Sequence, residues 1–81
     1  MLITVKFSSL FKTLSGADQD LVEVSEGATI DQLARVLGRK YKNLPFDSEL
    51  TYFLVNDKIS GRDHILSKGD NVRIFQTLRG G

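Results

Sequence analysis

The sequence predicts an α+β domain in which one main helix lies over a sheet of four to five strands. Alternating apolar and polar residues open and close the chain, an amphipathic stretch with a clear N-terminal cap lies between them, and turn residues separate the pieces. The chain has 81 residues, which is sufficient for one domain around one hydrophobic core.

The N-terminal third predicts a hairpin. Ile3, Val5 and Phe7 alternate with residues of the opposite face and indicate a first strand. A short helical turn is expected over residues 8–14 before Ser15-Gly16 ends it. Residues 20–24 are expected to form the second strand of the hairpin.

The main helix begins at Thr29. Thr29 and Gln32 have the capping-box spacing, in which each side chain accepts a hydrogen bond from a backbone N–H at the helix start. Asp31 in the first turn complements the helix dipole. Gly38 costs about 1 kcal/mol relative to Ala inside a helix and offers an early end, but we extend the helix to about Tyr41. The stripe expected to pack on the sheet consists of Ile30, Leu33, Ala34, Leu37 and Tyr41.

Three more strands are expected after a connector at 43–49. They are separated by the turn residues Asn56-Asp57 and by the turn at 67–70, and they lie at 52–55, 58–59 and 71–75. In the last strand Val72 and Ile74 face one way, and Phe75 faces the other. We expect the first strand and the strands that follow the helix to be neighbours.

The charge balance argues against nucleic-acid and membrane binding. The net charge is +1, whereas nucleic-acid binders carry a marked basic excess. The one basic cluster, Arg39-Lys40-Tyr41-Lys42, falls in the last turn of the expected helix, where cations complement the dipole. We therefore expect neither nucleic acid nor membrane as a partner. The first residues do not resemble a secretion signal, so the expected compartment is the cytoplasm.

Residues that usually catalyse reactions or bind metals are absent or isolated. The chain has no Cys, which excludes a disulfide, a thiolate metal site and a thiol nucleophile. His64 is the only histidine, and we expect it on the surface with no metal bound. Asp18 and Asp20 are expected to be a solvated loop pair. The sequence therefore favours a protein that is not an enzyme.

The chemistry is expected at Gly80-Gly81. We divide the sequence into a domain at 1–76 and a flexible tail at 77–81, because the tail has no apolar period. A terminal carboxylate is a poor electrophile until it becomes a mixed anhydride such as an acyl-adenylate. Glycines lack Cβ, so they can enter a narrow channel and leave the activated carbonyl unhindered. Gly81, with Gly80 beside it, is the predicted reacting end.

A resemblance to a known family spans nearly the whole chain. The matching segments are Val5-Lys6-Phe7 with the turn at 10–14, Ala28-Thr29-Ile30-Asp31-Gln32-Leu33, Val55-Asn56-Asp57-Lys58, Gly69-Asp70-Asn71-Val72-Arg73-Ile74-Phe75 and Gly80-Gly81. On these segments the sequence resembles the MoaD/ThiS family of sulfur carriers. The resemblance implies the ubiquitin-like β-grasp fold, a mixed sheet of four to five strands with one main helix packed across it.

The resemblance also implies a function and its partners. A partner enzyme would use ATP to adenylate Gly81, and the adenylate would become a thiocarboxylate that donates its sulfur to a precursor such as that of molybdopterin or thiazole. The chain itself would bind no cofactor. Its partners would be the adenylating enzyme and a large-subunit enzyme that accepts the sulfur, as for the small subunit of molybdopterin synthase. The expected partner-binding residues are Ile59 and Phe75, which form an apolar patch near the tail, and Leu78 and Arg79 in the tail itself.

The sequence leaves other functions open. MoaD-type carriers have a Pro-Pro-Val-like segment before the diglycine, whereas this chain has Gln76-Thr77-Leu78, and its Leu78-Arg79-Gly80-Gly81 resembles the end of ubiquitin. A protein modifier would use the same activated Gly81 to form an isopeptide bond with a target lysine. A non-covalent interaction domain, in which the tail plays no part, is the third possibility.

Overall fold

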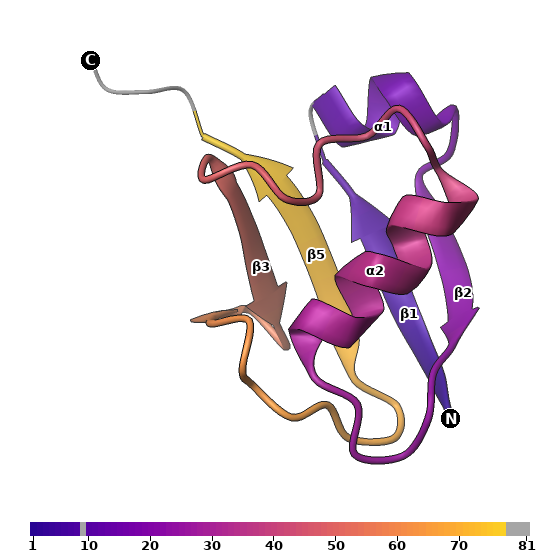
Figure 1. Cartoon of the computed structure of the whole chain (residues 1–81), viewed down its shortest axis with the longest axis vertical. Coiled ribbons are helices and arrows are strands. Elements are labelled where there is room, and N and C mark those ends of the chain that lie inside the picture. The colour runs from indigo at the N-terminus through magenta and orange to yellow at the C-terminus, as the bar shows by residue number, and fades with distance from the viewer. Residues whose placement is uncertain (9, 78–81) are drawn as a thin grey trace.

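The structure is a computed structural model that describes residues 1–8 and 10–77. Within this part of the chain, five strands form one sheet in the order β2-β1-β5-β3-β4. The elements in chain order are β1 (Leu2–Phe7), α1 (Leu10–Ser15), β2 (Gln19–Glu23), α2 (Ile30–Lys40), β3 (Thr51–Val55), β4 (Lys58–Ser60) and β5 (Asn71–Gln76). Helix α2 crosses one face of the sheet, and α1 lies at its end (Figure 1). This arrangement confirms the predicted α+β class.

The sheet is mixed because its two central strands run parallel. β1 pairs with β2 as an antiparallel hairpin and with β5 in parallel, with Val5 beside Val72. β3 pairs antiparallel with β5 on one side and with β4 on the other. The last strand of the chain therefore joins an N-terminal hairpin to the hairpin formed by β3 and β4.

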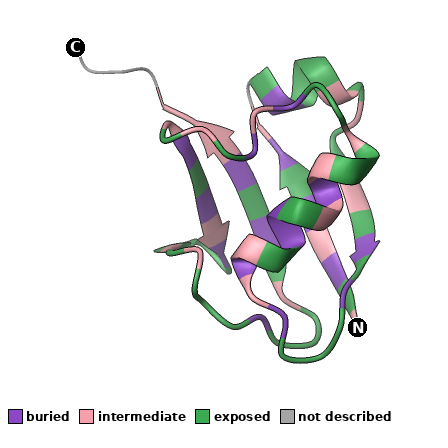
Figure 2. Ribbon diagram, in the orientation of Figure 1, coloured by how far each residue is buried: buried purple, intermediate pink, exposed green. Residues whose placement is uncertain are grey.

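Alternation in the strands separates a buried face from an open one. Residues on the α2 side of the sheet are buried, and together with the stripe of α2 they form the core (Figure 2). Leu33 and Leu37 of α2 have no exposed surface. The largest fully buried side chains are Phe11, Ile3, Ile30, Leu33, Leu37, Ile74, Val5 and Val72.

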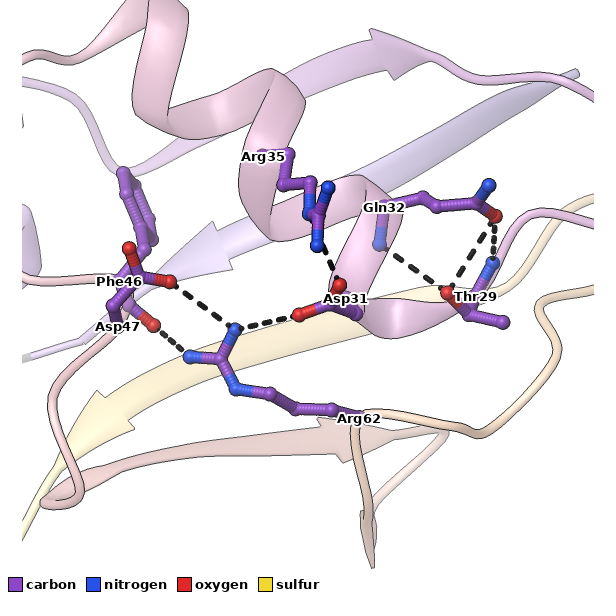
Figure 3. Close-up of polar contacts among 7 residues, drawn as sticks. All are labelled: Thr29, Asp31, Gln32, Arg35, Phe46, Asp47 and Arg62. Atoms are coloured by element: carbon purple, nitrogen blue, oxygen red, sulfur yellow. Dashed lines mark hydrogen bonds and ion pairs between the residues drawn. The ribbon is translucent and has the colours of Figure 1, made fainter.

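Both ends of α2 lie where the caps predict them. The N–H of Gln32 donates to Thr29 Oγ1 at 3.3 Å, and the N–H of Thr29 donates to Gln32 Oε1 at 2.8 Å, which completes the capping box (Figure 3). At the other end, the N–H of Tyr41 donates to the carbonyl of Leu37 at 2.7 Å. The helix continues through Gly38 instead of ending there, because Leu37 and Tyr41 on either side are packed against the core.

A second set of contacts ties the start of α2 to the segment at 61–66. The N–H groups of Ile30 and Asp31 donate to the carbonyls of His64 and Arg62 at 3.0 and 2.9 Å. These two donors have no partner within the helix, so the loop carbonyls supply the acceptors that the helix start lacks.

Arg62 joins three separate parts of the chain. Its guanidinium lies 3.3 Å from an oxygen of Asp31 on α2 and 3.4 Å from an oxygen of Asp47 on the connector, and it donates to the buried carbonyl of Phe46 (Figure 3). It also lies 5.3 Å from the centre of the Phe53 ring on β3. Arg62 therefore holds the connector after α2 against the helix start and the sheet.

The prediction of a solvated acidic pair is wrong for Asp20. This residue lies in β2 with its side chain 19% exposed, at 2.6 Å from Lys40 Nζ, and it accepts a hydrogen bond from the Tyr41 hydroxyl at 2.6 Å. These hydrogen bonds, from Lys40 first and then Tyr41, lower the pKa of Asp20. The pKa of Tyr41 is raised to about 12, mainly by burial and next by the hydrogen bond to Asp20. Asp20 thus fastens the end of α2 to the edge of the sheet.

Candidate docking face and chain exit

The open face of the sheet carries a group of aromatic and aliphatic side chains around the end of β5. Val72 and Ile74 are buried under α2, as predicted, while Phe75 points to the opposite face and is half-buried. Phe75 stacks on Tyr52 of β3, with the ring centres 5.8 Å apart and the planes inclined by 24°. Because β5 is the central strand of the sheet, Phe75 does not cover an edge.

Strand register extends this group across the sheet. Tyr52 is directly opposite Phe75, and Leu54 is directly opposite Ile59 of β4. Opposite residues of an antiparallel pair point to the same face, so all four side chains lie on the open face. Ile59 is 68% and Tyr52 is 38% exposed. We call Tyr52, Leu54, Ile59 and Phe75 the docking face.

Two cations lie beside the docking face. Lys6 of β1 and Arg73 of β5 are neighbours across the parallel pair, and both are exposed. Neither forms an ion pair with any residue that the structure describes. Lys6 and Arg73 line one hollow together with Asp57, so this part of the open face has more positive than negative charge.

A tight turn fixes the hairpin that presents Ile59. Asn56 and Asp57 have φ angles of 50° and 71°, the left-handed values that a two-residue hairpin loop requires. The Asn56 side chain accepts from the N–H of Asn71 at 3.0 Å and donates to Asp70 at 2.9 Å. The turn between β3 and β4 is therefore tied to the start of β5, which keeps the docking face in register.

The chain leaves the sheet next to the docking face. The N–H of Thr77 donates to the carbonyl of Leu50 at 2.9 Å, so pairing with the β3 side continues one residue past β5. Leu78, Arg79 and Gly80-Gly81 lie outside the described residues.

Of the predicted partner-binding residues, the structure brings Ile59 and Phe75 to one face. Sequence reasoning did not single out Tyr52, Leu54, Lys6 and Arg73. The signal for Tyr52 and Leu54 was their alternation with Thr51, Phe53 and Val55, which a short apolar run conceals.

The described residues offer no metal site and no membrane span. Among residues 1–8 and 10–77, no group of three or more His, Asp or Glu side chains is placed to bind a metal ion. His64 is exposed, as predicted. Neither of the two helices in this part of the chain has the length and apolar character to cross a membrane.

Comparisons with known proteins agree with this architecture. The model of the ThiS family matches residues 5–81, whereas no curated protein sequence matches the chain. Among solved structures, a protein described as molybdopterin converting factor subunit 1 from Pyrococcus furiosus is 24% identical, with a TM-score of 0.85 over 96% of this chain and 99% of that one.

Two further structures have the same fold. Small archaeal modifier protein 1 of Haloferax volcanii is 15% identical, with a TM-score of 0.86 over 95% of this chain and 98% of that one. A chain of the BexX/CysO complex of Amycolatopsis orientalis is 20% identical, with a TM-score of 0.71 over 98% and 99%. The neighbours thus include a protein described as a molybdopterin converting factor subunit, a small archaeal modifier and a chain of a complex.

Proposed function

The chain belongs to the ThiS family, and we propose that it is a sulfur carrier that acts through the carboxylate of Gly81. The observation that carries the proposal is the family match, which extends through Gly80 and Gly81. A partner enzyme performs the catalysis and uses the ATP, while this chain binds no cofactor and serves as the co-substrate. We place this activity in the cytoplasm.

The proposed reaction has two steps. The Gly81 carboxylate oxygen attacks the α-phosphorus of ATP, and pyrophosphate leaves. A sulfur nucleophile of the hydrosulfide class then attacks the acyl carbon and AMP leaves, so that one sulfur replaces one oxygen in the thiocarboxylate. Because glycine has no Cβ, the acyl carbon is open to attack from either side. The sulfur then passes to a biosynthetic precursor, in the manner of the small subunit of molybdopterin synthase.

The docking face supplies the binding energy for this reaction. Four residues follow Thr77 up to Gly81, and a chain of that length spans at most about 14 Å. The enzyme must therefore hold Thr77 within that distance of its nucleotide site. We assign the hydrophobic contact to Phe75 and Ile59, with Leu78 and Arg79 leading into the channel. Lys6 and Arg73 favour acidic residues on the partner.

A second candidate function shares the first step. In a protein modifier the amine of a target lysine attacks the adenylated or thioester-linked Gly81, and an isopeptide bond forms. Leu78-Arg79-Gly80-Gly81 and the fold of small archaeal modifier protein 1 favour this alternative. The two functions differ in the nucleophile that the activated carbonyl meets.

Mass spectrometry of the intact protein tests both functions. Incubation with an adenylating enzyme of the same cell and ATP should release pyrophosphate, and added sulfide should raise the mass by the difference between sulfur and oxygen, located at Gly81. Deleting Gly81 should abolish both events while the circular dichroism spectrum is unchanged. Gly81→Ala, the matched control, should react slowly because one methyl crowds the carbonyl and the carboxylate remains.

Two results would change this conclusion. Undiminished activation after deletion of Gly81 would exclude both the carrier and the modifier. Lysine conjugates in the cell without any gain of sulfur would assign the modifier.

A further inference from the structure

The connector between α2 and β3 sets the point at which the chain leaves the sheet. It runs past the end of β5 before it enters β3 (Figure 1). The N–H of Thr77 donates to the carbonyl of Leu50, the last residue of the connector, at 2.9 Å. This hydrogen bond is the last backbone contact that the structure describes before the tail. The position of Leu50 therefore decides where the tail starts.

A buried hydroxyl fixes the connector beside Leu50. Thr51 is the one polar residue that is buried in the described part of the chain, with 8% of its surface exposed. Its hydroxyl donates to the carbonyl of Pro45 at 2.8 Å, and its N–H donates to the carbonyl of Ser48 at 3.0 Å. A buried hydroxyl is costly unless it is hydrogen-bonded, and here its partner is the connector. Thr51 therefore folds the connector against the start of β3.

Ser48 ends the pairing of β3 with β5. Thr51 lies opposite Gln76, so the next pair along the ladder is Leu50 and Thr77. Residues of a hydrogen-bonded antiparallel pair exchange two bonds. Here the N–H of Leu50 donates to Ser48 Oγ at 3.1 Å instead of to the carbonyl of Thr77, so the pair has only the bond from Thr77. The ladder stops at this residue and the chain is released from the sheet.

We propose that Ser48 and Thr51 are positioning residues for the reaction at Gly81, an inference that rests on the proposed function. Together they hold the backbone of Leu50, and Leu50 holds Thr77 as the last anchored residue. Four residues then remain to carry the carboxylate into the nucleotide site of the activating enzyme. Neither side chain touches the reacting atoms, so both act through the chain exit.

The hold on Thr77 affects the reaction through the length of the tether. If Thr77 is released, the last anchored residue is Phe75, which stacks on Tyr52. Six residues instead of four then separate the anchor from the end of Gly81. The effective concentration of a tethered group falls roughly as the −3/2 power of tether length, which gives a loss of about twofold. Docking should not change, because the members of the docking face all precede Thr77.

Hydrogen exchange of the free protein tests the hold on Thr77. Thr51→Val removes the hydroxyl and keeps the shape of the side chain, so the Thr77 amide should exchange about fivefold faster. Thr51→Ser keeps the hydroxyl and should restore slow exchange. Thr29→Ala removes the cap of α2, away from the exit, and should leave exchange at Thr77 unchanged.

Single-turnover adenylation with saturating enzyme and ATP tests the effect on the reaction. Thr51→Val and Ser48→Ala should each lower the rate within the complex about twofold, while the Kd for the enzyme is unchanged. Thr51→Ser and Ser48→Thr keep the oxygen atoms and should restore the rate. Thr29→Ala, the control for lost stability, should react like the wild type. Ser48 is half-buried, so Ser48→Ala tests the same point if Thr51→Val does not fold.

The outcomes separate this inference from the proposed function. A wild-type chain that is not adenylated would exclude the proposed function, and the inference with it. A wild-type chain that reacts no faster than Thr51→Val and Ser48→Ala would overturn the positioning role alone. So would a loss of affinity in place of rate, or an equal loss of rate in Thr29→Ala, because either result would give these residues a merely structural role.

Discussion

Replacing Arg62 by Met should destabilise the protein by about 2–3 kcal/mol. The buried carbonyl of Phe46 loses its donor, which costs about 1–3 kcal/mol. The loss of the cation above the Phe53 ring adds about 0.5–1 kcal/mol. The ion pairs with Asp31 and Asp47 add little, because these carboxylates are 38% and 95% exposed. Met keeps the aliphatic stem of the side chain, so the measured loss belongs to the guanidinium.

Urea unfolding followed by circular dichroism measures this loss as a free energy, and heating followed by the same signal gives the unfolding temperature. For a domain of this size, 1 kcal/mol corresponds to about 4–8 °C, so the unfolding temperature should fall by about 10–20 °C. Arg62→Lys, the control, keeps a cation but not the planar fork, and should lie between the wild type and Arg62→Met. A loss below about 0.5 kcal/mol for Arg62→Met would refute the assignment of Arg62 as the link between the connector, α2 and the sheet.

Four other perturbations test separate features. Thr29→Ala should lower the free energy of unfolding by about 1 kcal/mol through the lost cap, and Thr29→Ser should restore most of it; equal stabilities would show that Thr29 does not cap. Phe75→Ala should weaken binding to the activating enzyme, measured in a calorimetric titration, far more than it weakens folding. Leu21→Ala, on the same face but 60% exposed at the β2 edge, should affect neither binding nor folding. A larger effect of Phe75→Ala on folding than on binding would make Phe75 a core residue. Because its pKa is raised to about 12, Tyr41 contributes stability that is present below pH 10 and lost as the pH rises from 10 to about 12. In unfolding curves measured from pH 10 to about 12, the Tyr41→Phe variant should not lose this stability. If its stability declines at alkaline pH as in the wild type, Tyr41 is not the group responsible. Asp20 behaves in the opposite sense, because its pKa is lowered. Its contribution to the free energy of unfolding is present above pH 3.8 and is lost as the pH falls further. Asp20→Asn should therefore reduce the dependence of stability on pH at acid pH.

Local patterns were sufficient to predict the elements that depend on neighbours in sequence. The start of α2 followed from Thr29 and Gln32, three residues apart, and the buried faces of β1 and β5 followed from alternation. At Gly38, local propensity offered an early helix end, and tertiary packing overrode it.

Long-range contacts account for what the sequence did not reveal. The sequence predicts Asp20 as a solvated acid, because its hydrogen-bond partner Tyr41 lies 21 residues away along the chain. Tyr52 reads as part of a continuous apolar run, and only its register with Phe75 shows that it lies on the open face. The roles of Gly80, Gly81, Leu78 and Arg79 stay predictions, because these residues lie outside the described part of the chain.

The position of β5 makes the sheet depend on a strand that is synthesised after both hairpins. Of the described strands, β5 is the last in chain order, yet it alone joins the hairpin of β1 and β2 to the hairpin of β3 and β4. A nascent chain that stops before Asn71 lacks the strand with which both hairpins pair, and with it the core residues Val72 and Ile74. The stacked pair of Phe75 and Tyr52 therefore exists only on chains that have been made as far as the segment leading to Gly81. Under the proposed function, a partner that recognises this pair would therefore not bind copies that end before Phe75.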